Sequence, residues 1–298
     1  MTNQSRRLAL KNIVAGTALA GTAGMLSSFS FPGSDNPKST NLKGNINHSV
    51  CRWCFGSIPL EEFCAAAKKM GIVAIDLVGP KDWPVLQQHG LYSSMCNGAE
   101  INLTDGWNDP KFHAQLIKNY TEMIPLVAKA GYKNLICFSG SRRGITDEAG
   151  WNNCVEGLKQ VIGLAEKNGV TLVMELLNSK IDHKDYQCDK TPWGVELVKR
   201  LGSDNFRLLY DIYHMQVDEG DVIRTIRDNH QYINHYHTAG VPGRHEIDES
   251  QELYYPAIMA AIVKTGFKGY VAQEFIPSKK TTEEKLAALD KAVKICDV

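Results

Sequence analysis

The sequence has no excess of charge of either sign, and this limits the partners that it is expected to bind. It contains 33 Lys and Arg residues against 33 Asp and Glu residues. Arg6, Arg7 and Lys11 belong to an acid-free N-terminal stretch, so the rest of the chain carries 30 basic and 33 acidic residues. A balance near −3 gives no reason to expect nucleic acid or an anionic membrane surface as a partner.

Two nucleotide-binding motifs are also absent. The chain has neither the G-x-G-x-x-G turn of a dinucleotide-binding fold nor a phosphate-binding P-loop. Their absence argues against an open, doubly wound sheet. A convincing membrane-spanning run is missing too, because the apolar residues 13–29 are rich in Gly, Ala, Ser and Thr. We therefore expect no stable membrane insertion.

The eight cysteines do not point to a disulfide framework. Cys51 and Cys54 lie in an apparently extended segment, where the Cα atoms of residues three apart are separated by roughly 10 Å. That separation is too long for a disulfide. No second C-x-x-C and no nearby pair of histidines completes a zinc site. We expect the cysteines to be buried free thiols.

The N-terminus has the features of an export signal and is left out of the fold. The paired Arg6 and Arg7 precede the weakly hydrophobic residues 13–29, and a polar stretch follows at residues 32–39. This order resembles a twin-arginine signal. The alternative is a chance pair of arginines before a short membrane anchor.

The predicted organisation has three parts. Residues 1–31 form a twin-arginine-type signal peptide, residues 32–46 a linker and residues 47–298 one domain. The resemblance implies a periplasmic or otherwise exported protein that folds before export. A chain of 298 residues is long enough for one substantial core and short for two full-sized domains.

Short β-rich runs alternate with amphipathic helical patterns along the predicted domain, and glycines follow several of these patterns. Such alternation over about 250 residues is typical of a (β/α)8 barrel, so we predict an α/β, single-domain TIM barrel. The predicted strands are His48–Phe55, Val73–Leu77, Leu91–Cys96, Asn134–Phe138, Thr171–Leu176, Leu208–Ile212, Ile233–His237 and Tyr270–Phe275. The predicted helices are Leu60–Met70, Lys111–Ala130, Trp151–Lys167, Gly194–Leu201, Val222–Asp228, Leu253–Thr265 and Thr281–Ile295.

Acidic or imidazole side chains stand at the C-terminal ends of the last four predicted strands. They are Glu175, Asp211, His237 and Glu274. Strands avoid ionised carboxylates in their interiors, so four such residues in one class of position need a common compensation. A divalent cation supplies it, because these strand ends converge at the face where barrel enzymes place their sites. Any one of the four alone is better explained as a residue that hydrogen-bonds a loop.

The predicted ligand set consists of three carboxylates and one imidazole. Such an oxygen-rich set suits one Mn²⁺ or Mg²⁺ ion and leaves Co²⁺ or Zn²⁺ open. Alternation along a strand also places His235 on the same face as His237.

Three strings of residues resemble the xylose-isomerase-like barrels and, within them, the hydroxypyruvate isomerase group. They are Met174–Lys180, Asp211–His214 and Pro242–Glu246, and the similarity extends over most of the chain from about Val50. The first and third strings are fairly specific together and weak separately.

The resemblance implies a role for each strand-end residue. Glu175, Asp211, the residue of the seventh strand and Glu274 bind the metal, and Glu175 and Glu274 also exchange protons with the substrate. One position departs from the pattern, because hydroxypyruvate isomerases tend to carry glutamine where this chain has His237. The related ketose 3-epimerases carry histidine there.

These residues support a metal-dependent isomerisation of the aldose–ketose type on a small hydroxy-carbonyl compound. Glu175 and Glu274 come from strands three steps apart around the ring, so they can flank a substrate as base and acid, while the metal stabilises an enediolate. Arg244, in the loop after the seventh strand, is suited to bind a substrate carboxylate or hydroxyl group. The alternative is a surface arginine without a role in the site. His214 either hydrogen-bonds a substrate oxygen or supports a metal ligand.

Three other functions fit the same barrel. A ketose 3-epimerase, or another sugar or cyclitol epimerase or isomerase, uses the same metal and glutamate pair. A phosphodiesterase related to endonuclease IV needs more metal ligands and a basic face, and neither is apparent. An exported carbohydrate-binding protein without activity does not need two acids that face one centre. We expect a small-molecule substrate and no nucleic acid, and a homo-oligomer stays open.

Overall fold

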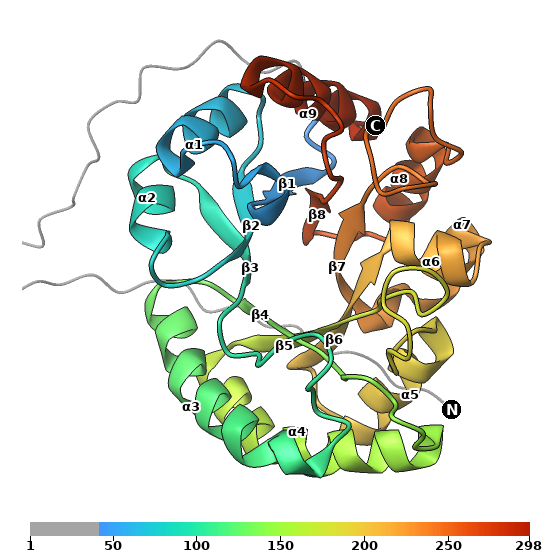
Figure 1. The fold of residues 1–298 in the computed structure, drawn as a ribbon. Helices are drawn as coiled ribbons and strands as arrows, with labels where there is room; N and C mark the ends of the chain where they lie inside the picture. The colour runs from blue at the N-terminus through green and yellow to red at the C-terminus, as the bar shows by residue number, and fades with distance from the viewer. Residues whose placement is uncertain (1–41) are drawn as a thin grey trace, which may run out of the picture. The chain divides into compact units, whose positions relative to one another are not determined.

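The computed structural model describes residues 42–298, which form a closed barrel of eight parallel strands (Figure 1). Each strand pairs with the next along the chain, and β8 pairs with β1. The predicted TIM barrel is confirmed. The strands are β1 Asn47–Cys51, β2 Ala74–Val78, β3 Tyr92–Cys96, β4 Asn134–Cys137, β5 Thr171–Glu175, β6 Phe206–Asp211, β7 Ile233–Thr238 and β8 Tyr270–Gln273.

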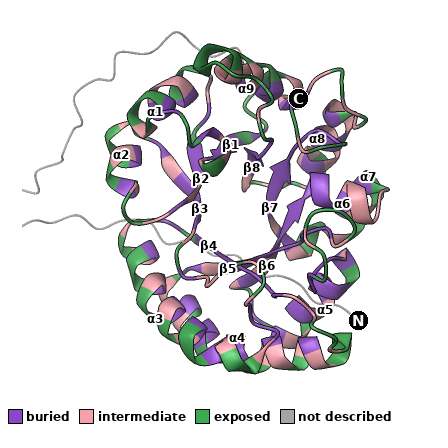
Figure 2. Cartoon of the chain, viewed as in Figure 1, coloured by how far each residue is buried: buried purple, intermediate pink, exposed green. Residues whose placement is uncertain are grey.

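Helices surround the strands, and their buried faces point inward (Figure 2). The hydrophobic core lies between the two layers and includes fully buried residues such as Phe63, Ile124 and Ile262. The helices are α1 Leu60–Lys69, α2 Trp83–Gln88, α3 His113–Lys129, α4 Asp147–Asn168, α5 Thr191–Leu201, α6 Ile212–Asp218, α7 Val222–Asn229, α8 Tyr255–Lys264 and α9 Thr282–Cys296.

Two helices were not predicted, and both are short. Six residues form α2 and seven form α6, so neither repeats its apolar pattern often enough to show a helical period. The helix α6 starts directly after β6, because the carboxylate of Asp211 accepts a hydrogen bond from the Tyr213 N–H at 2.8 Å and caps the helix.

The prediction of an extended segment through Cys54 is wrong. β1 ends at Cys51, and a 3-10 turn follows at Trp53–Phe55. All eight cysteines lie within residues 42–298 and are free, as predicted, and seven of them are buried.

The predicted export signal and most of the predicted linker lie outside the described residues. Residues just before β1 lie against the C-terminus, where the Lys43 N–H donates to Asp297 and the Asn45 side chain donates to the Val298 carbonyl. Within residues 42–298 no helix combines the length and the apolar character that crossing a membrane requires.

Two glycines of α4 allow a matched test of backbone conformation. Gly163 lies exposed in the helix interior, whereas Gly169 ends the helix at φ 64°. An added Cβ meets nothing within 4 Å at either position. We expect Gly163→Ala to raise the free energy of unfolding by about 0.5–1 kcal/mol and Gly169→Ala to lower it by about 1 kcal/mol. Urea unfolding checks both, and changes of the same sign would contradict this account.

Candidate functional site

Four buried side chains meet at the carboxyl ends of neighbouring strands. Glu175 and Asp211 are the last residues of β5 and β6, His237 is the penultimate residue of β7, and Glu274 directly follows β8. One ligand atom from each of them lies within 4.8 Å of the others. The structure therefore brings together the four residues that the sequence singled out as metal ligands.

Hydrogen bonds and ion pairs connect the members of this cluster. His237 Nδ1 lies 3.2 Å from Glu175 Oε1 and 2.8 Å from Glu274 Oε2. Arg244 Nη2 lies 3.1 Å from Asp211 Oδ2 and also pairs with Glu274 Oε2. Each carboxylate is therefore within reach of a cationic or hydrogen-bonding group.

Burial and mutual contact shift the pKa values of these groups. Burial and then the nearby Glu274 raise the pKa of Glu175, and burial raises the pKa of Asp211 to about 8. Burial also acts to raise the pKa of Glu274, but Arg244 and His237 outweigh it and hold that pKa well below the usual value. Burial acts to lower the pKa of His237, but Cys51, Glu274 and Asp76 hold it well above the usual value.

The donor atoms of the cluster fit a divalent cation. Glu175 Oε1 and His237 Nδ1 are buried and lie 3.2 Å apart, yet among the described residues neither has a partner in the geometry of a hydrogen bond. Both belong to the cluster of possible ligands. Buried polar atoms normally have partners, so two orphaned atoms at one point suggest a group that binds both. Three carboxylates and an imidazole are ligands that Mn²⁺, Mg²⁺, Co²⁺ and Zn²⁺ accept.

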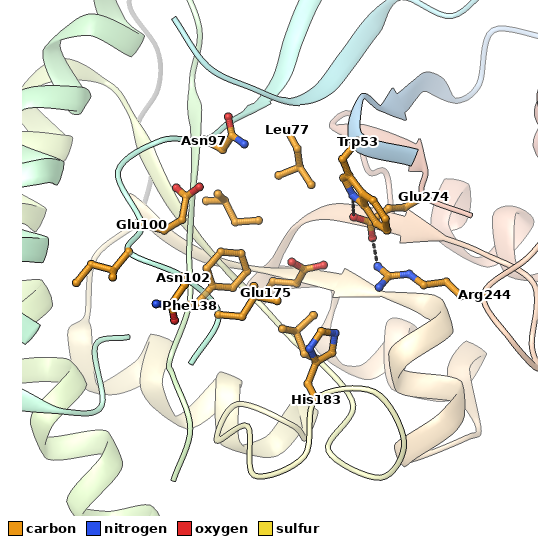
Figure 3. A pocket seen from close by; sticks show the side chains of 14 residues that line it. Trp53, Leu77, Asn97, Glu100, Asn102, Phe138, Glu175, His183, Arg244 and Glu274 are labelled. Atoms are coloured by element: carbon orange, nitrogen blue, oxygen red, sulfur yellow. Dashed lines mark hydrogen bonds and ion pairs between the residues drawn. The ribbon is translucent and has the colours of Figure 1, made fainter. Parts of the chain in front are cut away.

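A pocket of about 490 Å³ opens beside the cluster (Figure 3). Glu175, Glu274 and Arg244 line it, with Trp53 on the side of Glu274. The opposite wall is formed largely by the segment after β3, which contributes Asn97, Glu100, Ile101, Asn102 and Leu103.

Trp53 lies at the edge of the pocket and outside the hydrophobic core. Its side chain is 46 % exposed and its indole N–H donates to Glu274 Oε1 at 2.8 Å. The Arg244 guanidinium carbon lies 5.4 Å from the centre of the same ring, in cation–π contact. Trp53 therefore holds both Glu274 and Arg244 at the edge of the pocket.

Arg244 belongs to a loop that is fastened to the segment after β8. The residue has φ 60°, which few residues with a side chain adopt. Its carbonyl accepts from the Ile276 N–H at 2.7 Å, and His245 Nδ1 donates to the Ile276 carbonyl at 2.9 Å. Glu246 accepts from the Ser278 N–H at 2.8 Å. These bonds hold the guanidinium over Asp211 and Glu274.

His214 lies in the first turn of α6 and is fully buried. Its Nδ1 accepts from the Asn178 amide at 2.6 Å, and its Nε2 is 3.5 Å from Asp211 Oδ2. The residue does not line the pocket. The contact of His214 with a substrate stays a prediction. The contact that the structure shows is with Asp211, one of the predicted metal ligands.

Sequence reasoning missed Asp76 and the far wall of the pocket. Asp76 is a buried acid in the middle of β2, and its carboxylate lies 3.0 Å from His237 Nε2. The signal was present, because an acid interrupts an apolar strand there as it does at Glu175. Glu100 and Asn97 lie in an irregular loop, where no periodicity marks them.

Arg244 is expected to stabilise the metal-free protein, because it is the cation that pairs with buried Asp211 and Glu274. Arg244→Met should lower the free energy of unfolding by about 3–5 kcal/mol. Urea unfolding in the presence of a chelator measures this loss. The control is Arg143→Met, because Arg143 pairs with Asp105 at 36 % exposure and such pairs contribute about 0–1 kcal/mol. Equal losses in the two variants would speak against the buried cluster.

Three relatives of this chain have names that describe isomerases or epimerases. A putative hydroxypyruvate isomerase of Homo sapiens is 28% identical over 129 residues, 43% of this chain and 47% of that protein. A 2-oxo-tetronate isomerase of Cupriavidus necator is 32% identical over 128 residues, 43% and 48% of the two chains. A D-psicose 3-epimerase of Ruminiclostridium cellulolyticum is 29% identical over 134 residues, 44% and 43% of the two. The match thus spans about half the length of these relatives.

Solved structures match the barrel over most of its length. A family 2 AP endonuclease of Brucella melitensis has a TM-score of 0.72 and 25% identity, over 81% of this chain and 97% of that one. The IOLI protein with a bound zinc atom has a TM-score of 0.68 and 18% identity, over 84% of this chain and 98% of that one. At 18% identity, the similarity to the IOLI protein shows a shared fold alone.

The family match covers most of the barrel. Residues 56–292 match the family described as xylose isomerase-like TIM barrel. This range includes every strand from β2 to β8 and all four residues of the cluster. The chain belongs to the xylose isomerase-like TIM barrel family.

Proposed function

We propose that this protein is a metal-dependent isomerase that moves a hydrogen between neighbouring carbons of a small hydroxy-carbonyl compound, with hydroxypyruvate as the first candidate substrate. The observation that carries the proposal is the convergence of Glu175, Asp211, His237 and Glu274, whose ligand atoms lie within 4.8 Å of one another. The names of the human and Cupriavidus relatives support the reaction class.

The four side chains would hold one divalent cation, and their donor atoms favour Mn²⁺ or Mg²⁺ over Co²⁺ or Zn²⁺. When bound, the cation supplies Lewis-acid stabilisation of negative charge that develops on the substrate oxygens. Arg244 is placed to assist, because it lines the pocket and its Nε has no hydrogen-bond partner within the described part of the chain. That N–H can donate to a substrate carboxylate or hydroxyl group.

Glu175 and Glu274 supply the proton transfers. They reach the pocket from β5 and from the end of β8, three strands apart around the ring. One carboxylate takes the proton from the carbon beside the carbonyl group, and the other assists its return to the neighbouring carbon through an enediolate. The hydrogen lost by one carbon is gained by the other, and the proton lost by the hydroxyl oxygen is gained by the former carbonyl oxygen. The reaction therefore needs no external oxidant or reductant.

Replacing either glutamate with glutamine should preserve the barrel, and it removes both a proton carrier and one charged ligand of the proposed metal. We expect Glu175→Gln and Glu274→Gln each to lower kcat by about 10²–10⁴-fold. The assay follows isomerisation together with solvent deuterium incorporation, with Mn²⁺ and with chelator. The control is Glu219→Gln, because Glu219 is a half-buried acid that accepts from Thr191 at 2.9 Å and does not line the pocket. A doubly substituted protein that still isomerised substrate would rule out the pair.

The pocket itself favours a second candidate, an epimerase or isomerase of ketoses. Its volume of about 490 Å³ is far larger than the volume of a three-carbon acid, and it lies in the range of pockets that bind larger ligands. Glu100 adds a negative charge to the far wall. Among the described residues that line the pocket, Arg244 is the one Lys or Arg, and Asp211 and Glu274 already pair with it. A neutral polyol meets less repulsion there than a carboxylate does.

A substrate panel of hydroxypyruvate, 2-oxo-tetronate and ketohexoses separates the two candidates. If Glu100 disfavours anionic substrates, Glu100→Gln should raise kcat/KM for the acids roughly fivefold, because about 1 kcal/mol of repulsion is removed. The value for ketoses should stay within the scatter of the control Glu122→Gln on the surface of α3. A preference of the unsubstituted protein for hydroxypyruvate, unchanged in Glu100→Gln, would exclude the ketose candidate.

A further inference from the structure

A second group of polar side chains lies inside the barrel on the other side of His237. The imidazole Nδ1 faces Glu175 and Glu274, whereas Nε2 faces Asp76 at 3.0 Å. Asp76 and His237 are both fully buried. Asp76 does not line the pocket, so it cannot touch a substrate there.

Asp76 collects polar partners from three other strands. Ser94 of β3 donates to Oδ2 at 2.7 Å, and His235 Nε2 of β7 lies 2.8 Å from the same oxygen. The Cys51 thiol of β1 lies 3.5 Å from Oδ1. His235 and Ser94 thus lie at one carboxylate oxygen, whereas His237 and the more distant Cys51 thiol lie at Oδ1. All of these side chains are fully buried.

The backbone of β2 is distorted at this position. The pairing of β2 with β3 shifts register on either side of Asp76, and Leu77 has φ 54°. In a regular strand consecutive side chains point to opposite faces, yet Asp76 reaches the interior cluster while Leu77 lines the pocket. Bulges of this kind re-aim side chains beside functional sites, and a strained residue needs compensation.

Packing alone does not account for a carboxylate in this place. Asp76 is fully buried, and its carboxylate lies within hydrogen-bonding distance of the Ser94 hydroxyl group and of the imidazoles of His235 and His237. Burying an ionised carboxylate inside the barrel costs free energy unless the group is paired and hydrogen-bonded. His237 is the partner that connects Asp76 to the ligand cluster.

We propose that Asp76 is a positioning residue for the metal ligand His237. Its Oδ1 accepts the Nε2 proton, which turns the imidazole so that the lone pair of Nδ1 points toward Glu175 and Glu274. Carboxylates that bind the second nitrogen of a ligating histidine fix the ring in this way, and their loss typically weakens metal binding by about 10- to 100-fold. The inference rests on the metal site of the proposed function.

The test compares Mn²⁺ binding by the full chain and by Asp76→Asn. Asparagine keeps the shape of the side chain, but its amide can donate to Nε2 and so favours a proton on Nδ1. We expect the dissociation constant for Mn²⁺, measured by electron paramagnetic resonance, to rise by about 10- to 100-fold. The control is Ser94→Ala, which removes another hydrogen bond to Asp76 without touching His237. Its affinity for Mn²⁺ should match that of the unsubstituted protein.

A second measurement does not depend on any metal. Nitrogen-15 histidine NMR of the unsubstituted protein should show a hydrogen-bonded, slowly exchanging proton on His237 Nε2, and Asp76→Asn should shift this signal upfield. Absence of the signal in the unsubstituted protein overturns the proposal even if the variant fails to fold.

The remaining outcomes separate the two proposals. If the unsubstituted protein binds none of Mn²⁺, Mg²⁺, Co²⁺ or Zn²⁺, the proposed function fails. If Asp76→Asn binds Mn²⁺ as tightly as the unsubstituted protein does, the positioning role fails alone. Two Mn²⁺ ions per chain would also overturn that role, because Asp76, His235 and His237 would then be ligands of a second ion.

Discussion

Three carboxylates buried at one end of the barrel need positive charge close by, and the rest of the site is arranged to supply it. Glu175, Asp211 and Glu274 lose most of their hydration there, and each charge would be costly alone. Arg244 provides one fixed cation and His237 a second group that can carry charge. A divalent ion at their centre would complete the balance. The same demand that makes the cluster unfavourable when empty makes it a strong site for a cation.

Each partner of the carboxylates is itself held by contacts from another part of the fold. Arg244 is fastened through its loop to the segment after β8 and lies against Trp53. The Nε2 atom of His237 lies against the carboxylate of Asp76, and β2 shifts its register at Asp76. The residues that hold the cluster in place therefore come from other parts of the ring, Asp76 from β2 and Trp53 from the turn after β1.

The sequence was most informative where local pattern and function coincide. An acid at the end of an apolar run marked Glu175 and Asp211, and barrel topology then placed those strand ends together. Asp76 is an acid in the middle of an apolar strand, and the sequence did not reveal its role, because that role depends on how β2 lies relative to β7 in the folded barrel. The loop that carries Glu100 has no hydrophobic periodicity from which its position could be predicted. Short helices such as α6 have too few turns to show a helical period, and the residue that caps α6, Asp211, was assigned to the site.

The closure of the ring places the ends of the domain in direct contact at the site. Glu274 follows the last strand, and Trp53, which donates to it, follows the first, 221 positions earlier. β8 must pair with β1 before these two residues can meet. A chain still emerging from the ribosome therefore holds the carboxylates of β5 and β6 without their last ligand. The four possible ligands are therefore complete only when the ring has closed.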